Sequence, residues 1–76
     1  MHYHIIGIQG SSLSGIADLL RSEGHVVTGS DERTTGHGPD RLPSELDGVI
    51  FSEAVTPGSA GWPELEAARA RGVRCL

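Results

Sequence analysis

The sequence predicts a small α/β domain with three layers: about four parallel strands, with helices on both faces of the sheet. Short apolar, β-branched segments alternate with segments of helical period, and a turn rich in glycine and serine at residues 7–12 joins the first strand to the first helix. Such alternation is typical of a parallel sheet, because parallel strands need crossover connections. The 76 residues are expected to form one domain.

The first half of the chain predicts a strand, a helix and a second strand. Residues 3–8 are apolar and β-branched, as in a strand that is buried on both faces. Residues 12–23 place apolar side chains at helical spacing, and Gly24 suits the left-handed residue that follows a helix. We expect Gly15 to allow close packing of this helix on the sheet. Residues 25–29 (HVVTG) form the second predicted strand.

The second half predicts a loop, a strand, a helix and the start of a fourth strand. Residues 30–46 contain glycine and proline without a sustained period, which indicates a loop. Residues 47–52 (DGVIFS) are the third strand, and residues 62–71 are a second helix with Pro63 in its first turn. Residues 73–76 begin a fourth strand. The charged positions of the second helix predict a solvated face: Glu64, Glu66, Arg69 and Arg71.

Strand order decides where a ligand would bind. If the third strand lies on the far side of the first, the two helices cover opposite faces, and a crevice opens at the carboxyl ends of the strands. Three segments would converge there: residues 9–12, 30–31 and 52–55.

The turn at residues 7–12 has the composition of an anion site. Gly7 permits a sharp turn, and Gly10 leaves room for a ligand to approach the backbone. The amides of residues 10–13 lie at the positive end of the helix, where anions bind. The turn departs from the dinucleotide fingerprint G-x-G-x-x-G at Gln9 and Ser12. The plainer alternative is that glycine and serine serve only turn geometry and helix capping.

Composition excludes several classes of function. A net charge of −4, with six arginines and no lysine, argues against nucleic-acid binding and rules out a phosphate-loop lysine. No membrane span or signal peptide is visible, and the single Cys75 is typical of a cytoplasmic protein. His2, His4 and His25 lack metal-like spacing, so we interpret them as strand residues. No catalytic arrangement and no metal site are predicted in this chain.

Four segments resemble the Mur ligase family. They are HIIGIQGSSLSGIA (4–17), VTGSD (27–31), DGVIFSEAV (47–55) and PELEAARARGV (63–73), in the family's order. Gln9 and Ser12 replace family glycines, Leu13 replaces a methionine, and Glu53 replaces the usual serine. The helix and strand that normally follow the G-S-D segment in this family have no counterpart in this sequence, so the resemblance implies a shortened member.

The resemblance implies a Rossmann-like N-terminal domain that binds the UDP part of UDP-N-acetylmuramic acid. The parent protein would be an ATP-dependent amide-bond ligase of peptidoglycan biosynthesis, with ATP and Mg²⁺ held by a central domain outside this chain and with a further C-terminal domain. The implied diphosphate contacts are Gly7, Gln9, Gly10, Ser11, Ser12 and Leu13. The implied uridine contacts are Ser30, Asp31, His37, Ser52, Ala54 and Val55.

Two other interpretations stay open at this point. Asp31 follows Gly7 at the distance of the acidic residue that binds ribose hydroxyls in nicotinamide-dependent oxidoreductases. A non-catalytic interaction remnant is the third interpretation, because an incomplete sheet leaves apolar surface through which the chain would self-associate.

Replacement of Gly10 by valine tests the anion site. A β-branched side chain would intrude on the path of the phosphate and would resist a positive φ angle. We expect Gly10→Val to weaken UDP binding in a titration by more than it lowers the free energy of unfolding. Equal losses would make Gly10 a structural glycine.

Overall fold

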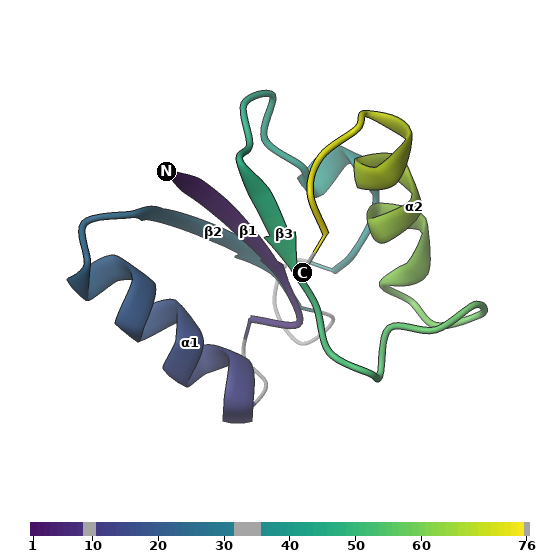
Figure 1. Ribbon diagram of the computed structural model, residues 1–76. Coiled ribbons are helices and arrows are strands. Elements are labelled where there is room, and N and C mark those ends of the chain that lie inside the picture. The colour runs from purple at the N-terminus through teal and green to yellow at the C-terminus, as the bar shows by residue number, and fades with distance from the viewer. Residues whose placement is uncertain (9–10, 32–35, 76) are drawn as a thin grey trace.

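The computed structural model describes residues 1–8, 11–31 and 36–75 and shows a small α/β fold (Figure 1). Its elements, in chain order, are β1 (His2–Ile6), α1 (Ser11–Ser22), β2 (Val26–Ser30), the 3₁₀ turn η1 (Pro39–Arg41), β3 (Gly48–Ile50) and α2 (Trp62–Ala70). Each lies within two residues of its expected bounds, apart from η1, which is one short turn in the expected loop. The predicted α/β class is confirmed.

The three strands form one parallel sheet in the order β2-β1-β3. The third strand therefore lies on the far side of the first, which is the condition under which the sequence analysis expects a crevice at the carboxyl ends of the strands. All three strands end at the same edge of the sheet. Beyond them, Cys75 makes a single parallel bridge with Val49, so the described part of residues 73–76 reaches the sheet without forming a fourth strand.

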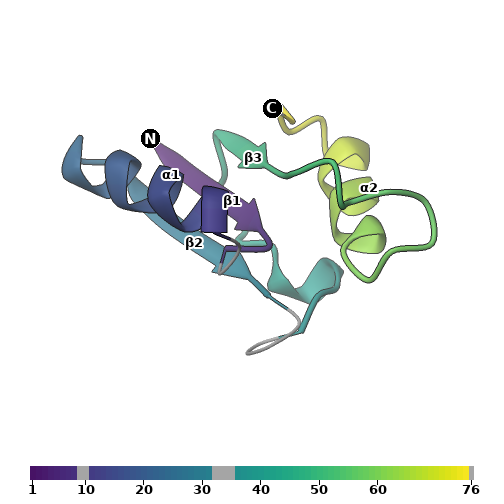
Figure 2. The same ribbon diagram turned by 90° about the horizontal axis from the view of Figure 1, so that it is seen from below.

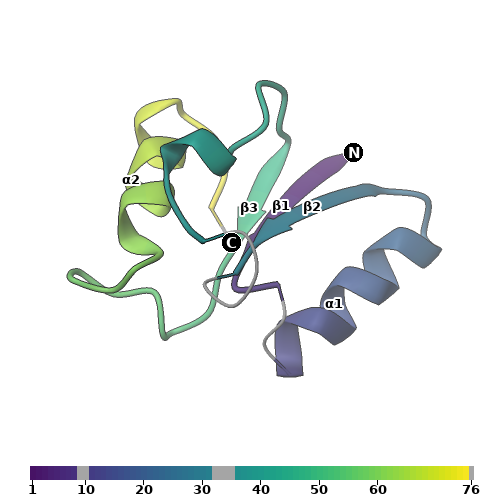
Figure 3. The same cartoon turned by 180° about the vertical axis from the view of Figure 1, so that it is seen from behind.

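Alternate residues of β1 contact the two helices. Ile5 packs with Leu13 and Ala17 of α1, whereas Ile6 packs with Leu65 and Ala68 of α2. Successive side chains of a strand point to opposite faces of a sheet. Figure 2 shows α1 in front of β1 and β2, and Figure 3 shows the strands running between the two helices.

The close approach between chain segments occurs at Gly29 of β2 and not at Gly15 of α1. Gly15 is exposed, and a Cβ atom built there would meet nothing within 4 Å, so the expected role of Gly15 in helix packing is wrong. At Gly29, a Cβ atom would lie 2.6 Å from Cβ of Ile8 and 2.5 Å from its Cδ1. The segment after β1 thus crosses directly over β2, and only glycine fits beneath it.

Two glycine substitutions should change stability in opposite directions. Gly29→Ala should lower the free energy of unfolding by about 1–3 kcal/mol, because Ile8 and its backbone must move. Gly15→Ala should raise it by about 0.5–1 kcal/mol, since alanine loses less conformational entropy in a helix. Urea unfolding of both variants measures this, and a destabilised Gly15→Ala would contradict the assignment.

Candidate functional site

The turn after β1 rests on the end of β2. Gly7 has a φ angle of +88°, a conformation that favours glycine. The amides of Gly7 and Ile8 both donate to the carbonyl oxygen of Ser30, at 2.7 and 3.0 Å. Because α1 begins at Ser11, its N-terminus follows this turn directly. The carboxyl edge of the sheet thus combines a positive helix end with the last residues of β2, an arrangement suited to an anion.

The expected diphosphate contacts are only partly described. Gln9 and Gly10 lie outside the described residues, and Ser11 is described through its backbone as the first residue of α1. Ser12 is exposed. The side chain of Leu13 is buried against Ile5 and Ala17, so only its amide is available to a ligand.

The expected uridine contacts separate into two groups. Ser30, Asp31 and His37 gather at the end of β2, where Ser30 and Asp31 are buried. The amide of Gly36 donates to the carbonyl oxygen of Asp31 at 2.9 Å and returns the chain to this edge.

The second group follows β3, on the other side of β1. The hydroxyl oxygen of Ser52 accepts from the amide of Ala54 at 3.3 Å, and both residues are exposed. Val55 is half-buried and packs with the apolar cluster of Ile6 and Leu65. Ser52 and Ala54 are therefore exposed on the solvent side of this edge, whereas the side chain of Val55 is part of the apolar core.

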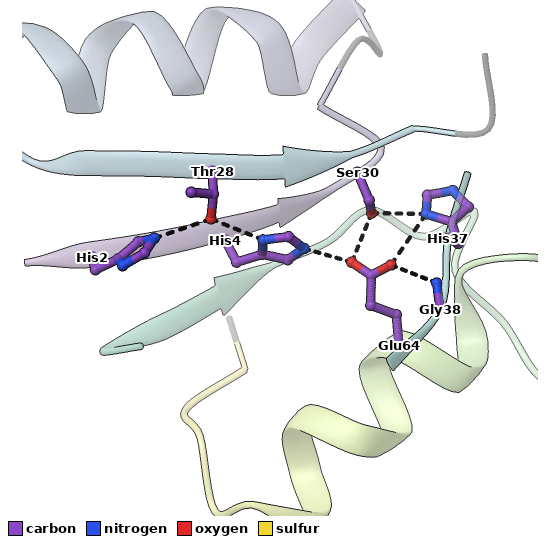
Figure 4. A network of polar contacts seen from close by, with 7 residues as sticks. All are labelled: His2, His4, Thr28, Ser30, His37, Gly38 and Glu64. Carbon is purple, nitrogen blue, oxygen red and sulfur yellow. Dashed lines mark hydrogen bonds and ion pairs between the residues drawn. The ribbon is translucent and has the colours of Figure 1, made fainter. Parts of the chain in front are cut away.

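A buried polar network supports the end of β2 from below (Figure 4). Its centre is Glu64 of α2, which is 0% exposed. Its Oε2 atom accepts from His4 Nε2 at 2.6 Å and from the Ser30 hydroxyl at 2.7 Å. Its Oε1 atom accepts from the Gly38 amide at 3.0 Å and lies 3.6 Å from His37 Nδ1.

The network continues along the same face of the sheet. His4 Nδ1 lies 2.9 Å from the hydroxyl oxygen of Thr28, which in turn lies 3.1 Å from His2 Nε2. His4 and Thr28 are register partners in neighbouring strands. Since every second residue of a strand faces the same way, His2 and His4 of β1 share this face with Thr28 and Ser30 of β2. In the described part of the chain, every buried side-chain nitrogen and oxygen has a hydrogen-bond partner.

The surroundings of Glu64 lower its pKa. Burial on its own raises the pKa, but hydrogen bonds from His4, Ser30 and the Gly38 amide, together with the charge of His4, outweigh burial. Glu64 is therefore a carboxylate near neutral pH and acts as a hydrogen-bond acceptor only.

Sequence analysis missed this network. The prediction of a solvated face is wrong for Glu64, although Glu66 and Arg69 are exposed as expected. The guanidinium of Arg71, also exposed, donates to the carbonyl oxygens of Pro43 and Ser44. One signal was available, because Glu64 precedes Ala68 by four residues and so shares the apolar stripe of α2.

Neither a metal centre nor a membrane span emerges from the described ranges. No three His, Cys, Asp or Glu side chains among residues 1–8, 11–31 and 36–75 are grouped so that they could hold a metal ion. Within the same ranges, no helix has the length and apolar character needed to cross a bilayer.

Fold and site together define an α/β domain with a parallel sheet, and the carboxyl ends of such strands are the edge at which open α/β sheets bind their ligands. A model described as "Mur ligase family, catalytic domain" matches residues 2–76. The chain belongs to the Mur ligase family, which confirms the resemblance found in the sequence.

Several curated proteins to which the chain is similar are UDP-N-acetylmuramate–L-alanine ligases. That of Roseiflexus sp. is 37% identical over 91 residues, covering 100% of this chain and 19% of the relative. That of Agathobacter rectalis is 31% identical with the same coverage, and that of Acidothermus cellulolyticus is 38% identical, covering 96% of this chain and 18% of the relative. This chain thus spans about a fifth of their length. No solved structure matches it.

The alignments also bear on the length of the chain. Two of these relatives align over 91 positions with a chain of 76 residues, so they contain residues that have no counterpart here. This agrees with a shortened member of the family. That the missing part is a helix and a strand after β2 stays a prediction.

Acid should weaken the fold through Glu64. Because the folded-state pKa of Glu64 lies below its ordinary value of 4.5, its contribution to stability is present above that pH and is lost as the pH falls through the folded-state pKa. We expect the free energy of unfolding of the wild type to fall more steeply below pH 4.5 than that of Glu64→Gln. Urea unfolding from pH 7 to pH 3 measures the difference, with the exposed Glu66→Gln as control. Parallel curves for wild type and Glu64→Gln would contradict this account.

Proposed function

We propose that this chain binds the UDP moiety of UDP-N-acetylmuramic acid, as the N-terminal domain of an ATP-dependent amide-bond ligase of peptidoglycan biosynthesis. The observation that carries the proposal is that the amides of Gly7 and Ile8, in the turn after β1, both donate to the carbonyl oxygen of Ser30. This contact brings the N-terminal turn of a helix together with Asp31, the acidic residue that directly follows β2. The names of the similar ligases supply the substrate.

The proposed ligand follows the chemistry of this edge. The diphosphate would lie at the amides of residues 10–13, where the helix end favours negative charge. The carboxylate of Asp31 would accept hydrogen bonds from the uridine, and residues 52–55 would form the opposite wall. Main-chain amides thus bind the charged part of the ligand, and side chains distinguish the nucleoside.

The remaining expectations belong to the same proposal. The parallel bridge between Val49 and Cys75 supports a fourth strand at residues 73–76, which would complete the four-stranded sheet with helices on both faces. ATP and Mg²⁺ would be bound by another domain of the parent ligase. Among the described residues of this chain, no three His, Cys, Asp or Glu side chains are grouped so that they could hold a metal ion. A cytoplasmic location follows from the same assignment to nucleotide-dependent synthesis.

A nicotinamide dinucleotide is the second candidate ligand, since a buried acidic residue at the end of β2 is also where a dinucleotide ribose would bind. Titrations of the ¹⁵N-labelled chain with UDP, UDP-N-acetylmuramic acid and NADH separate the two ligand classes. We expect amide shifts at residues 9–12 and 30–31 with both UDP ligands and none with NADH. Shifts with NADH alone would overturn the assignment.

Asp31 provides the sharpest single test. Under the UDP assignment, Asp31→Ala removes a charge-assisted hydrogen bond worth about 1.5–3 kcal/mol. UDP binding should therefore weaken about 10- to 150-fold. Asp31→Asn should lose less, because its amide keeps one acceptor oxygen.

Calorimetric titration measures the affinities, and thermal melting of the same variants reports on the fold. Asp18→Asn is the matched control, since the side chain of Asp18 is 82% exposed on α1. UDP affinity that is unchanged in both Asp31 variants, with only a lower melting temperature, would mean that Asp31 serves the turn alone.

A further inference from the structure

One carboxylate joins both ends of the connection that follows β2. Through Oε2, Glu64 accepts from the hydroxyl of Ser30, the last residue of β2. Through Oε1 it accepts from the amide of Gly38, which directly precedes η1. The same side chain accepts from His4 in the central strand. Glu64 therefore ties α2, β1 and the two flanks of residues 32–35 to a single point (Figure 4).

The hydrogen bonds also determine which nitrogen of His37 carries a proton. The Ser30 hydroxyl has one hydrogen, and it is donated to Glu64 at 2.7 Å. The 2.8 Å contact between the Ser30 oxygen and His37 Nδ1 therefore requires Nδ1 to be the donor. In the neutral imidazole, Nε2 is then the unprotonated nitrogen and a hydrogen-bond acceptor.

We propose that Glu64 is a positioning residue for the nucleoside end of the candidate site, which holds residues 36–38 against β2 and, through Ser30, directs the ring proton of His37 to Nδ1. The proposal rests on the proposed function, because it concerns the residues that are expected to meet the uridine. In this proposal the hydroxyl of Ser30 links two residues of the protein: it donates to Glu64 and accepts from His37. Glu64 itself is fully buried and acts only through Ser30, His37 and Gly38.

A buried carboxylate is well suited to this task. Its four partners come from three separate parts of the chain, so the carboxylate is satisfied only when those parts are together. The lowered pKa of Glu64 keeps it ionised and acceptor-only near neutral pH, which in turn forces the Ser30 hydroxyl to donate. Support of this kind fixes a binding residue more tightly than a loop alone can.

The first experiment needs no variant and no ligand. Long-range ¹H–¹⁵N correlation spectra of the histidine rings, recorded at a pH where the imidazoles are neutral, distinguish the two tautomers. We expect His37 to carry its proton on Nδ1 in the wild type. A proton on Nε2 would overturn the proposal, whatever the ligand of the site is.

The second experiment measures UDP binding by calorimetric titration in Glu64→Gln, with Glu66→Gln as the matched control on the exposed face of α2. If loss of the carboxylate leaves the binding arrangement about one tenth populated, the apparent Kd for UDP rises about tenfold. We also expect amide shifts at residues 36–38 and a change in the His37 tautomer in Glu64→Gln, and neither in Glu66→Gln.

The outcomes separate the two proposals. A Glu64→Gln chain that melts earlier but binds UDP as tightly as the wild type would show a purely structural role and overturn the positioning role. A wild type that does not bind UDP would overturn the proposed function, and the tautomer of His37 would then decide the positioning role by itself. Should Glu64→Gln fail to fold, the wild-type ring spectrum still decides it.

Discussion

The hydrogen-bonded pair of His4 and Glu64 is the constraint on which this fold depends. It joins the central strand to α2 across 60 residues of sequence, with both side chains nearly inaccessible to solvent. An ionised carboxylate left unpaired in such a place costs several kcal/mol. A small domain has a total stability of only about 5 kcal/mol or a little more. An incomplete network with an ionised Glu64 would therefore cost a large part of this stability, which favours the one position of α2 on the sheet that satisfies it.

Local patterns were sufficient to predict the layout of the molecule. Apolar runs that end in glycine located β1 and β2. Right-handed crossovers left a few strand orders open, and the structure has the order β2-β1-β3 that the sequence analysis considered. The burial of Glu64 was not predicted, because a charged residue on a helix is ordinarily solvated. Its burial depends on a histidine near the other end of the chain, His4. The predicted packing role of Gly15 was wrong because a glycine in a helix does not by itself show whether another segment comes close to it.

The candidate site depends more on the backbone than on side chains. The turn after β1 is held by two amides on one carbonyl oxygen, and Leu13 is available to a ligand only through its amide. Ser12, which is expected to stand where the family has glycine, is exposed at the start of α1. Topology predicted which segments meet at this edge. It could not predict that Ser30 and His37 are bonded to a carboxylate beneath it.

The position of β2 at the outside of the sheet has a consequence for how members of the family can differ in length. β1 has both of its neighbours within this chain, so its pairing is complete. A further strand and helix inserted after β2 would add to the outer border of the sheet and leave both neighbours of β1 in place. Gain or loss of such a unit changes the width of the sheet, while the order of the three strands that meet at the ligand edge stays the same.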